Sequence, residues 1–240
     1  MVSLSDFQTT LLTHPDQEYL CRDNLNLYDS PQLERLATQA IAHRHLRVVP
    51  PTADGELTLT DGAVFVRLCE DDYPGWMALE DVDLLDIAEE PYCPVTLSTA
   101  EIGDRLPQVI AFAQAAMRQP NHYLWGGTTG PNYDCSGLVQ TAFASAGIWL
   151  PRDAYQQEAF VQAIALADLQ PGDLIFFGTP ERCTHVGLAL GESRYIHSSG
   201  KDQGRNGIGI DILSNQGDAI SQAYYHQLRG AGRVVACYSL

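Results

Sequence analysis

Positive charge is scarce in this chain of 240 residues, in which Lys201 is the single lysine. The formal net charge is −16, and residues 1–100 carry 18 Asp and Glu against 5 Arg, whereas residues 101–240 are close to balanced, with 12 against 9 Lys and Arg. A surplus of carboxylates repels phosphates, which argues against nucleic acid as a partner. We interpret the acidity as a solubility feature, and its uneven spread as a first sign of two domains.

Long apolar runs are missing too. No stretch approaches the ~20 apolar residues of a membrane span, and the N-terminus Met-Val-Ser-Leu-Ser-Asp-Phe-Gln has no basic segment followed by an apolar one. The six cysteines are scattered, with no C-x-x-C pair, which fits neither a zinc site nor a small disulfide scaffold. We therefore expect a reduced, cytoplasmic protein with no membrane partner.

The first part of the chain is predicted to be a small β-barrel. Short alternating segments, such as Leu57–Thr60 and Val64–Leu68 on either side of the turn Asp61-Gly62, run from Leu20 to about Leu85. Pro31 to Ala42 is the exception, because its apolar spacing favours a helical insert. Gly75-Trp76 and the apolar end Val82–Leu85 resemble the bacterial SH3-like domains that accompany cell-wall enzymes. We assign residues 1–95 to this domain and expect residues 1–19 to form an N-terminal arm.

The second part, residues 102–240, is predicted to be an α+β domain. An amphipathic helix is expected over Leu106–Met117 and a short one near Tyr155–Ile164. They are followed by five predicted strands: Asp173–Phe177, His185–Leu190, Arg194–His197, Ile208–Ile212 and Arg233–Ala236. Helices followed by an antiparallel run of strands are typical of the α+β class.

Cys135 stands where a glycine-rich loop, residues 123–134, gives way to a helix that continues to Ala146. Free backbone N–H groups and the helix dipole at such a position favour thiolate and lower the pKa of a cysteine. A small buried core residue is the alternative. Cys183 is expected to be buried in a strand or loop.

A cysteine nucleophile needs a base and a group that orients the base. His185 opens one predicted strand and His197 ends the next. If the two strands pair about a turn at Glu192–Ser193, both imidazoles lie at one end of the hairpin. A helix bearing Cys135, packed across that sheet, would complete a Cys–His–His line. Each histidine could instead be an ordinary core or surface residue.

Five blocks of sequence, in order, resemble the NlpC family of papain-like cysteine peptidases: Tyr123-x-Trp-Gly-Gly127, Asp134-Cys-Ser-Gly-Leu138, Leu169-x-Pro-Gly-Asp-Leu-x-Phe-Phe177, Thr184-His-Val-Gly187 and Tyr195-Ile-His197. The resemblance implies a papain-like fold and hydrolysis of bacterial cell-wall peptides without a metal or other cofactor. It makes Cys135 the nucleophile, His185 the base and His197 the orienting residue. Tyr123 and the backbone N–H of Cys135 would help to bind the oxyanion.

The pairing with an SH3-like domain is similar to a subgroup of γ-D-glutamyl-L-diamino acid endopeptidases, which act on peptides with a free N-terminal L-Ala. The resemblance implies that Asp153 pairs with that amine, that Tyr73 of the first domain lies beside it, and that Trp125, Asp134 and Ser136 line the cleft. Asp153 could instead cap the following helix, and Tyr73 could be a core residue. Ala154 departs from the subgroup, which often has Ser or Thr there.

The expected partner is a murein tri- or tetrapeptide met by a monomer during wall recycling in the cytoplasm. Two alternatives stay open: an amidase or acyltransferase that uses the same Cys–His pair, and a wall-binding module with an inactive catalytic domain. The presence of Cys135, His185 and His197 argues against the inactive module.

Overall fold

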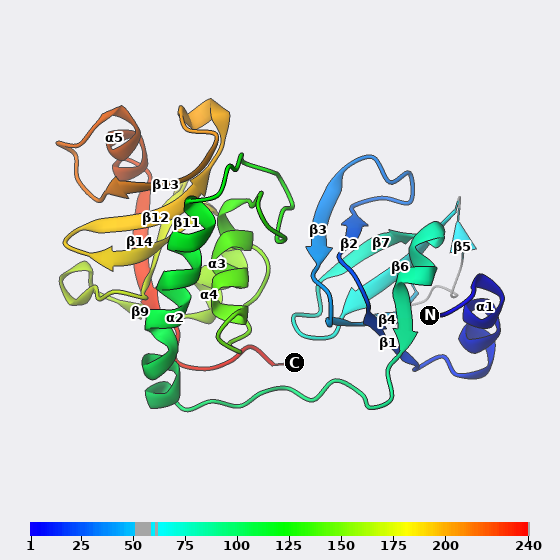
Figure 1. The fold of residues 1–240 in the computed structure, drawn as a ribbon. Helices are drawn as coiled ribbons and strands as arrows, with labels where there is room; N and C mark the ends of the chain where they lie inside the picture. Colours follow the sequence, from blue (N-terminus) through cyan, green and yellow to red (C-terminus); the bar gives the residue numbers. More distant parts are fainter. Residues whose placement is uncertain (51–58, 61, 240) are drawn as a thin grey trace. The chain divides into compact units, whose positions relative to one another are not determined.

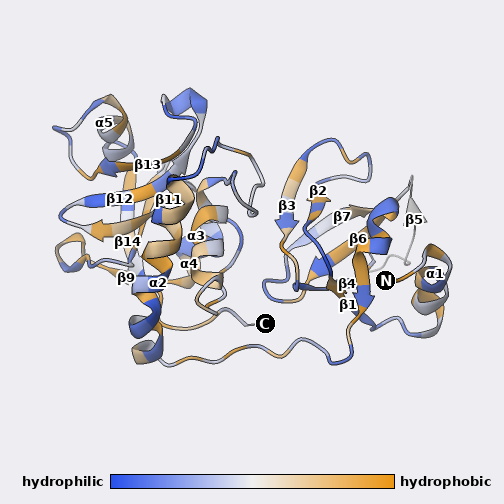
Figure 2. Cartoon of the chain, in the orientation of Figure 1, coloured by the Kyte–Doolittle hydropathy of each residue, from blue (hydrophilic) through white to orange (hydrophobic). Residues whose placement is uncertain are grey.

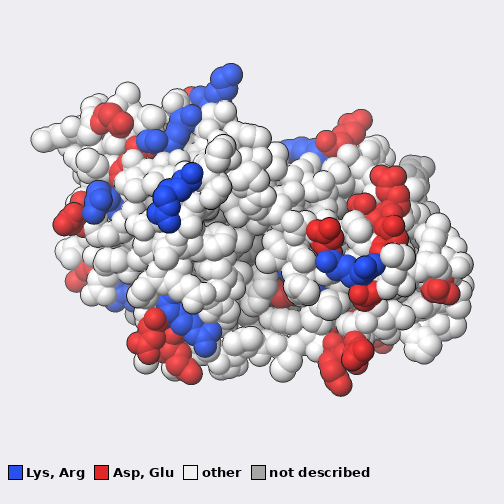
Figure 3. Space-filling model, in the orientation of Figure 1, with Lys and Arg blue, Asp and Glu red and all other residues white. Residues whose placement is uncertain are grey.

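The computed structural model describes residues 1–50, 59–60 and 62–239, which form two compact units, Met1–Pro94 and Val95–Ser239 (Figure 1). Each unit has its own hydrophobic core and is described by itself. On the face drawn in Figure 3, acidic side chains gather over the first unit, where the sequence has most of its carboxylates. No helix in the described residues is long and apolar enough to cross a membrane.

The first unit is an antiparallel sheet with a short helix, α1 (Leu4–Thr13). Its strands are β1 (Glu18–Cys21), β2 (Leu25–Tyr28), β3 (Leu36–Ala40), β4 (His45–Val48), β5 (Leu59–Thr60), β6 (Ala63–Leu68), β7 (Pro74–Ala78) and β8 (Leu85–Ile87). A 3₁₀ helix, Leu79–Leu84, lies between β7 and β8. The strand order is β3-β2-β7-β6-β4-β1-β8, with β5 paired to β6. Alternate residues of β1, β2 and β4 are buried, as expected for a sheet with one face on a core.

The predicted helical insert at Pro31–Ala42 is wrong, because Leu36–Ala40 forms strand β3 and pairs with β2. Buried Thr38 and Ala40 alternate with more exposed neighbours, so the segment has the period of a strand. The predicted hairpin is present, with Leu59 opposite Val64 and Thr60 opposite Ala63. Its turn residue Asp61 and the first two residues of its first predicted strand lie outside the described residues.

The second unit places helices on both faces of a six-stranded antiparallel sheet of order β13-β12-β11-β10-β14-β9. The strands are β9 (Gln162–Ile164), β10 (Leu174–Gly178), β11 (Cys183–Gly191), β12 (Arg194–Ser199), β13 (Gly207–Ile212) and β14 (Leu228–Arg233). The helices are α2 (Thr99–Met117), α3 (Cys135–Ala144), α4 (Ala154–Phe160) and α5 (Ala219–Tyr225), with 3₁₀ turns at Leu166–Asp168 and Lys201–Gln203. The combination of helices and an antiparallel sheet confirms the α+β class.

The two faces of this sheet have separate cores. On one face, α2, α3 and α4 pack against Leu174, Phe176 and Leu188, and α3 is hydrophobic along much of its length (Figure 2). On the other face, Ile175 and Phe177 of β10 pack against Tyr195 and against Tyr224 of α5. Successive residues of β10 therefore pack into different cores, one on each face of the sheet. Helix α3 packs directly against β11 and β12.

Several element boundaries differ from the sequence prediction. The helix expected over Leu106–Met117 already begins at Thr99, where Ser98 forms a capping box with Glu101. The last strand is Leu228–Arg233 rather than Arg233–Ala236. The short helix ends at Phe160, and the chain continues as β9, which pairs with β14. Gly232 explains this contact, since a Cβ there would lie 2.2 Å from Cγ2 of Val161.

Candidate active site

Cys135 is the first residue of α3 and is only 6% exposed. Asp134 is the N-cap of the helix, and its Oδ1 accepts the N–H of Gly137 at 2.6 Å. A Cβ on Gly137 would lie 2.1 Å from the carbonyl oxygen of Gly127, so the glycine-rich loop closes directly onto the start of the helix. The loop and the cap together fix the position of the thiol.

Asp134 also forms a buried ion pair with Arg152. The Nη2 of Arg152 donates to Oδ2 at 2.6 Å and its Nη1 to Oδ1 at 3.1 Å, while Gly126 N–H donates to Oδ2 at 2.9 Å. Nη1 of Arg152 also donates to Ser136 Oγ at 3.0 Å. The carboxylate thus ties the loop, the helix start and Arg152 together. Substrate contact by Asp134 or Ser136 stays a prediction, since both are buried in this cluster.

His185 and His197 come together as expected from the hairpin. Ala189 pairs with Tyr195 across β11 and β12, and the turn residues Glu192 and Ser193 have φ of 53° and 57°. His185 Nε2 and His197 Nδ1 are 2.7 Å apart. A Cβ on Gly187 would lie 2.6 Å from Cδ2 of Tyr195 and 3.5 Å from Cβ of His197, so the glycine leaves room for these rings.

Asp211 of β13 extends this pair into a chain of hydrogen bonds. His197 Nε2 lies 2.6 Å from Asp211 Oδ2, and Arg205 donates to the other carboxylate oxygen. Arg205 crosses Gly209, where a Cβ would lie 2.2 Å from its Nη1. His197 and Asp211 are both buried, so the chain is shielded from water.

This row of hydrogen bonds determines which nitrogen of each imidazole carries the hydrogen. An ionised carboxylate only accepts, so His197 Nε2 carries a hydrogen and its Nδ1 accepts one. His185 Nε2 is then the donor to His197, and Nδ1 of His185 is left with a lone pair. Hydrogen bonds from the backbone of Val186 and of Ser136 act on the Cys135 thiol, which places the sulfur beside the strand that carries His185. Nδ1 of His185 is therefore the nitrogen that can take the thiol proton.

Aromatic rings hold the His185 imidazole in place. Tyr224 of α5 stacks on it with ring centroids 4.5 Å apart and 29° between the planes, and the centroid of Phe177 lies 5.9 Å away. The Tyr224 hydroxyl is 2.7 Å from Ser199 Oγ, which anchors the stacking ring. Neither Tyr224 nor Asp211 was identified from the sequence.

Burial governs the ionisation of the nucleophile and the base. It raises the pKa of the Cys135 thiol to about 12, with a smaller contribution from Asp134. Burial, and then the neighbouring His197, lower the pKa of His185 well below 6.5. The prediction that the helix start lowers the cysteine pKa is wrong, because desolvation outweighs the backbone hydrogen bonds. The free site therefore favours a neutral thiol and a neutral imidazole.

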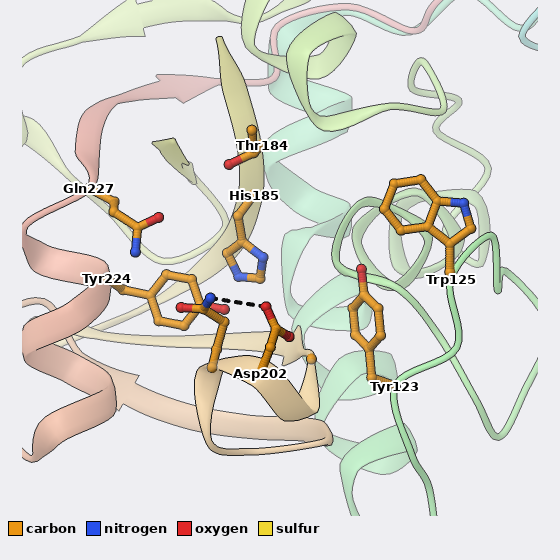
Figure 4. Close-up of a pocket in the computed structure, with 9 residues that line it drawn as sticks. Tyr123, Trp125, Thr184, His185, Asp202, Tyr224 and Gln227 are labelled. Carbon is orange, nitrogen blue, oxygen red and sulfur yellow. Dashed lines mark hydrogen bonds between the residues drawn. The ribbon is translucent and has the colours of Figure 1, made fainter. Parts of the chain in front are cut away.

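A cavity of about 280 Å³ opens beside His185 and is drawn in Figure 4. It is lined by Tyr123, Trp125, Thr184, His185, Gly200, Asp202, Gln203, Tyr224 and Gln227. The Tyr123 side chain projects into this cavity. Burial, and then Cys135 and Asp134, raise the pKa of Tyr123, so its hydroxyl is a proton donor at neutral pH, as the predicted oxyanion role requires. Trp125 is 57% exposed at the rim.

Asp153 is not among the residues that line the cavity. Asp153 is the N-cap of α4, where its N–H donates to Gln156 Oε1 at 3.0 Å, so the capping alternative matches its position. Tyr73 belongs to the first unit, where its N–H donates to Asp71 Oδ1 at 3.2 Å. The roles predicted for both in binding the substrate amine stay predictions.

Cys183, the other cysteine close to the site in sequence, is a buried residue of the sheet. Cys183 is buried at the start of β11, as expected, and burial raises the pKa of its thiol to about 11. Within the residues that the structure describes, no group of three or more His, Cys, Asp and Glu side chains could hold a metal ion.

A thiol at a helix start, packed against an antiparallel sheet that carries a paired histidine base, defines the papain-like class of cysteine peptidases. Residues 120–229 match the model of the NlpC/P60 family, and residues 27–82 match that of the bacterial dipeptidyl-peptidase SH3 domain. The chain therefore carries an NlpC/P60 cysteine peptidase domain preceded by an SH3 domain.

Two relatives and one solved structure are similar to parts of this chain. A probable endopeptidase of Mycobacterium tuberculosis is 42% identical over 98 residues, 40% of this chain and 24% of the relative. A γ-D-glutamyl-L-lysine dipeptidyl-peptidase of Bacillus cereus is 28% identical over 225 residues, 68% of this chain and 67% of the relative. The crystal structure of an NlpC/P60 family protein from Bacillus cereus has 21% identity and a TM-score of 0.48, covering 95% of this chain and 66% of that one.

Proposed function

We propose that this protein hydrolyses the bond between γ-D-glutamate and a diamino acid in murein peptides that begin with a free L-Ala. The observation that carries the chemical part is the row of hydrogen bonds from Asp211 through His197 to His185, which leaves Nδ1 of His185 as the nitrogen that can accept the proton of the thiol. The choice of bond is supported by the Bacillus cereus relative, which is named for a γ-D-glutamyl-L-lysine link.

The reaction is acyl transfer in two steps. His185 Nδ1 takes the thiol proton as the sulfur attacks the γ-carbonyl carbon, and the Tyr123 hydroxyl donates to the resulting oxyanion. The proton on His185 then passes to the leaving amine, the C–N bond breaks and a thioester remains on Cys135. Water, deprotonated by His185, attacks the thioester and releases the dipeptide with restoration of the thiol.

The neutral resting state fits this order of events. Because burial disfavours a thiolate–imidazolium pair in the empty site, charge separates only as the sulfur attacks and the oxyanion is bound. The hydrogen bond from His185 to His197, and from His197 to the Asp211 carboxylate, stabilises the imidazolium as it forms.

The requirement for a free amine is tested with a matched pair of peptides. L-Ala-γ-D-Glu-diaminopimelate and its N-acetylated copy are incubated with the protein, and free diaminopimelate is measured. Release from the first peptide alone supports the proposed function in free-peptide recycling. Equal release from both contradicts the amine requirement, and release of ammonia or of an acyl-transfer product instead supports the amidase or acyltransferase alternative.

A further inference from the structure

The cavity beside His185 has one charged group, Asp202, to which the reaction described above assigns no role. Of the nine described residues that line it, Asp202 alone is charged at neutral pH, since burial keeps His185 neutral. Tyr123 and Tyr224 are the other titratable lining residues, and the pKa of each phenol is raised by burial. No lysine or arginine is among the nine, so Asp202 supplies the charge of the cavity lining.

Asp202 lines the cavity from a short turn after β12. The residue lies in the 3₁₀ turn Lys201–Gln203, which follows β12 and thus His197. A Cβ on Gly200 would lie 2.4 Å from Asp202 Oδ1, so the carboxylate lies close to the backbone of Gly200. Gln203 Nε2 donates to Oδ2 at 3.1 Å. Figure 4 shows the carboxylate between the rings of Tyr123 and Tyr224, below His185.

The cavity is lined by His185, the residue that handles the leaving group. His185 lines it, whereas Cys135 does not, and His185 is the residue that gives its proton to the departing amine. About 280 Å³ is just under the ~300–1,000 Å³ of pockets for drug-sized ligands, which suits one amino-acid residue rather than a longer peptide. Aromatic rings on both sides would contact the methylene groups of a long side chain and attract a terminal cation.

We infer that this cavity binds the leaving diamino acid and that Asp202 pairs with its side-chain ammonium group. The inference rests on the proposed function and adds the specificity at the leaving residue: a side chain with net positive charge, such as that of L-lysine, is preferred over a neutral one of the same length. Asp202 is exposed, so solvent and salt screen the pair.

The test compares L-Ala-γ-D-Glu-L-Lys with L-Ala-γ-D-Glu-L-norleucine, which lacks only the amine. The wild-type protein is expected to cleave the lysine peptide with a kcat/KM roughly two- to fivefold higher, mainly through KM, and added salt should reduce this preference. Asp202→Asn should lower kcat/KM for the lysine peptide more than for the norleucine peptide and so remove the preference. Glu192→Gln is the matched control, because it removes one exposed carboxylate in the turn between β11 and β12, away from the cavity.

The possible results distinguish a failure of this inference from a failure of the proposed function. Equal kcat/KM for the two peptides in the wild-type protein would overturn the inference and leave the proposed function standing. An equal fall for both peptides in Asp202→Asn would also overturn it, since that pattern indicates a structural role. Failure to release either amino acid would overturn the proposed function and this inference with it.

Discussion

Replacing Asp211 with Asn is expected to reverse the protons of both site histidines. Asp211 receives hydrogen bonds from His197 and from Arg205, one on each oxygen. Asn offers one oxygen and one NH2 group, and Arg205 can only donate, so the Asn oxygen turns to Arg205. The NH2 group then donates to His197 Nε2, which has to give up its hydrogen. His197 Nδ1 becomes the donor, and the hydrogen of His185 moves to Nδ1, the nitrogen that must be basic.

The expected loss of kcat follows from the free energy needed to return both histidines to their working tautomers. To restore the working tautomers, the Asn side chain has to turn its oxygen to His197 and lose its hydrogen bond with Arg205. A hydrogen bond to a charged group is worth about 1.5–3 kcal/mol, which corresponds to a roughly 10- to 150-fold loss in kcat. The ¹⁵N chemical shifts of the imidazoles report the tautomers directly, and steady-state hydrolysis of L-Ala-γ-D-Glu-L-Lys reports kcat.

A second substitution separates this explanation from simple damage to the fold. In Arg205→Leu/Asp211→Asn the Asn oxygen is free to face His197, so kcat should recover above that of the single Asp211→Asn variant. Thermal unfolding of all three proteins controls for stability. The reasoning is refuted if Asp211→Asn keeps kcat within threefold of the wild type, or if the double variant is no more active than Asp211→Asn.

Three further predictions concern the second unit. Asp153→Ala should lower kcat/KM for peptides with a free N-terminus more than tenfold, while loss of the helix cap lowers the free energy of unfolding by only about 1 kcal/mol. Steady-state kinetics and urea titration measure the two effects. A loss of stability without a loss of kcat/KM would show that Asp153 is a cap with no role in binding. Gly187→Ala should destabilise the protein by about 1–3 kcal/mol, because a Cβ there lies 2.6 Å from Cδ2 of the buried Tyr195, and an unchanged thermal midpoint would contradict this. Burial lowers the pKa values of His185 and His197, so below pH 6.5 the unfolded state binds more protons than the folded state. The free energy of unfolding should therefore be highest above pH 6.5 and fall as the pH decreases towards the folded-state pKa values. A urea midpoint that stays constant from pH 7 to pH 5 would contradict this.

The parts of the site that the sequence revealed are those marked by local patterns. Cys135 follows a glycine-rich loop and starts a helix, and the two histidines lie near the ends of adjacent strands joined by a tight turn. The local backbone of each segment determines these features, so spacing and turn chemistry were enough to bring His185 and His197 together. Their packing against α3 followed from the order of helices and strands.

The parts that the sequence did not reveal depend on contacts between distant segments. Asp211 reaches His197 only because β13 pairs with β12, and Tyr224 reaches His185 because α5 covers the outer face of the sheet. Nothing in the residues next to Asp211 or Tyr224 marks either contact. The pKa of Cys135 was misjudged for the same reason, since the number of groups that bury a thiol is not visible in its local sequence.

Fold errors came from segments whose composition fits more than one period. Leu33, Leu36, Ala37 and Ala40 have helical spacing, yet pairing with β2 makes Leu36–Ala40 a strand. The last strand was predicted too far along the chain because Gly230 and Gly232 lower the apparent strand propensity of β14. In the structure, Val161 occupies the space that Gly232 leaves.

The most direct test of the central claim is to identify the products formed from L-Ala-γ-D-Glu-L-Lys by the wild-type protein and by Cys135→Ala. Mass spectrometry should find L-lysine and the dipeptide L-Ala-γ-D-Glu with the wild type, and only intact tripeptide with Cys135→Ala, whose thermal unfolding should show that it is folded. Release of L-lysine by Cys135→Ala at the wild-type rate would contradict the role of the thiol, and release of free L-Ala by the wild type would contradict the choice of bond.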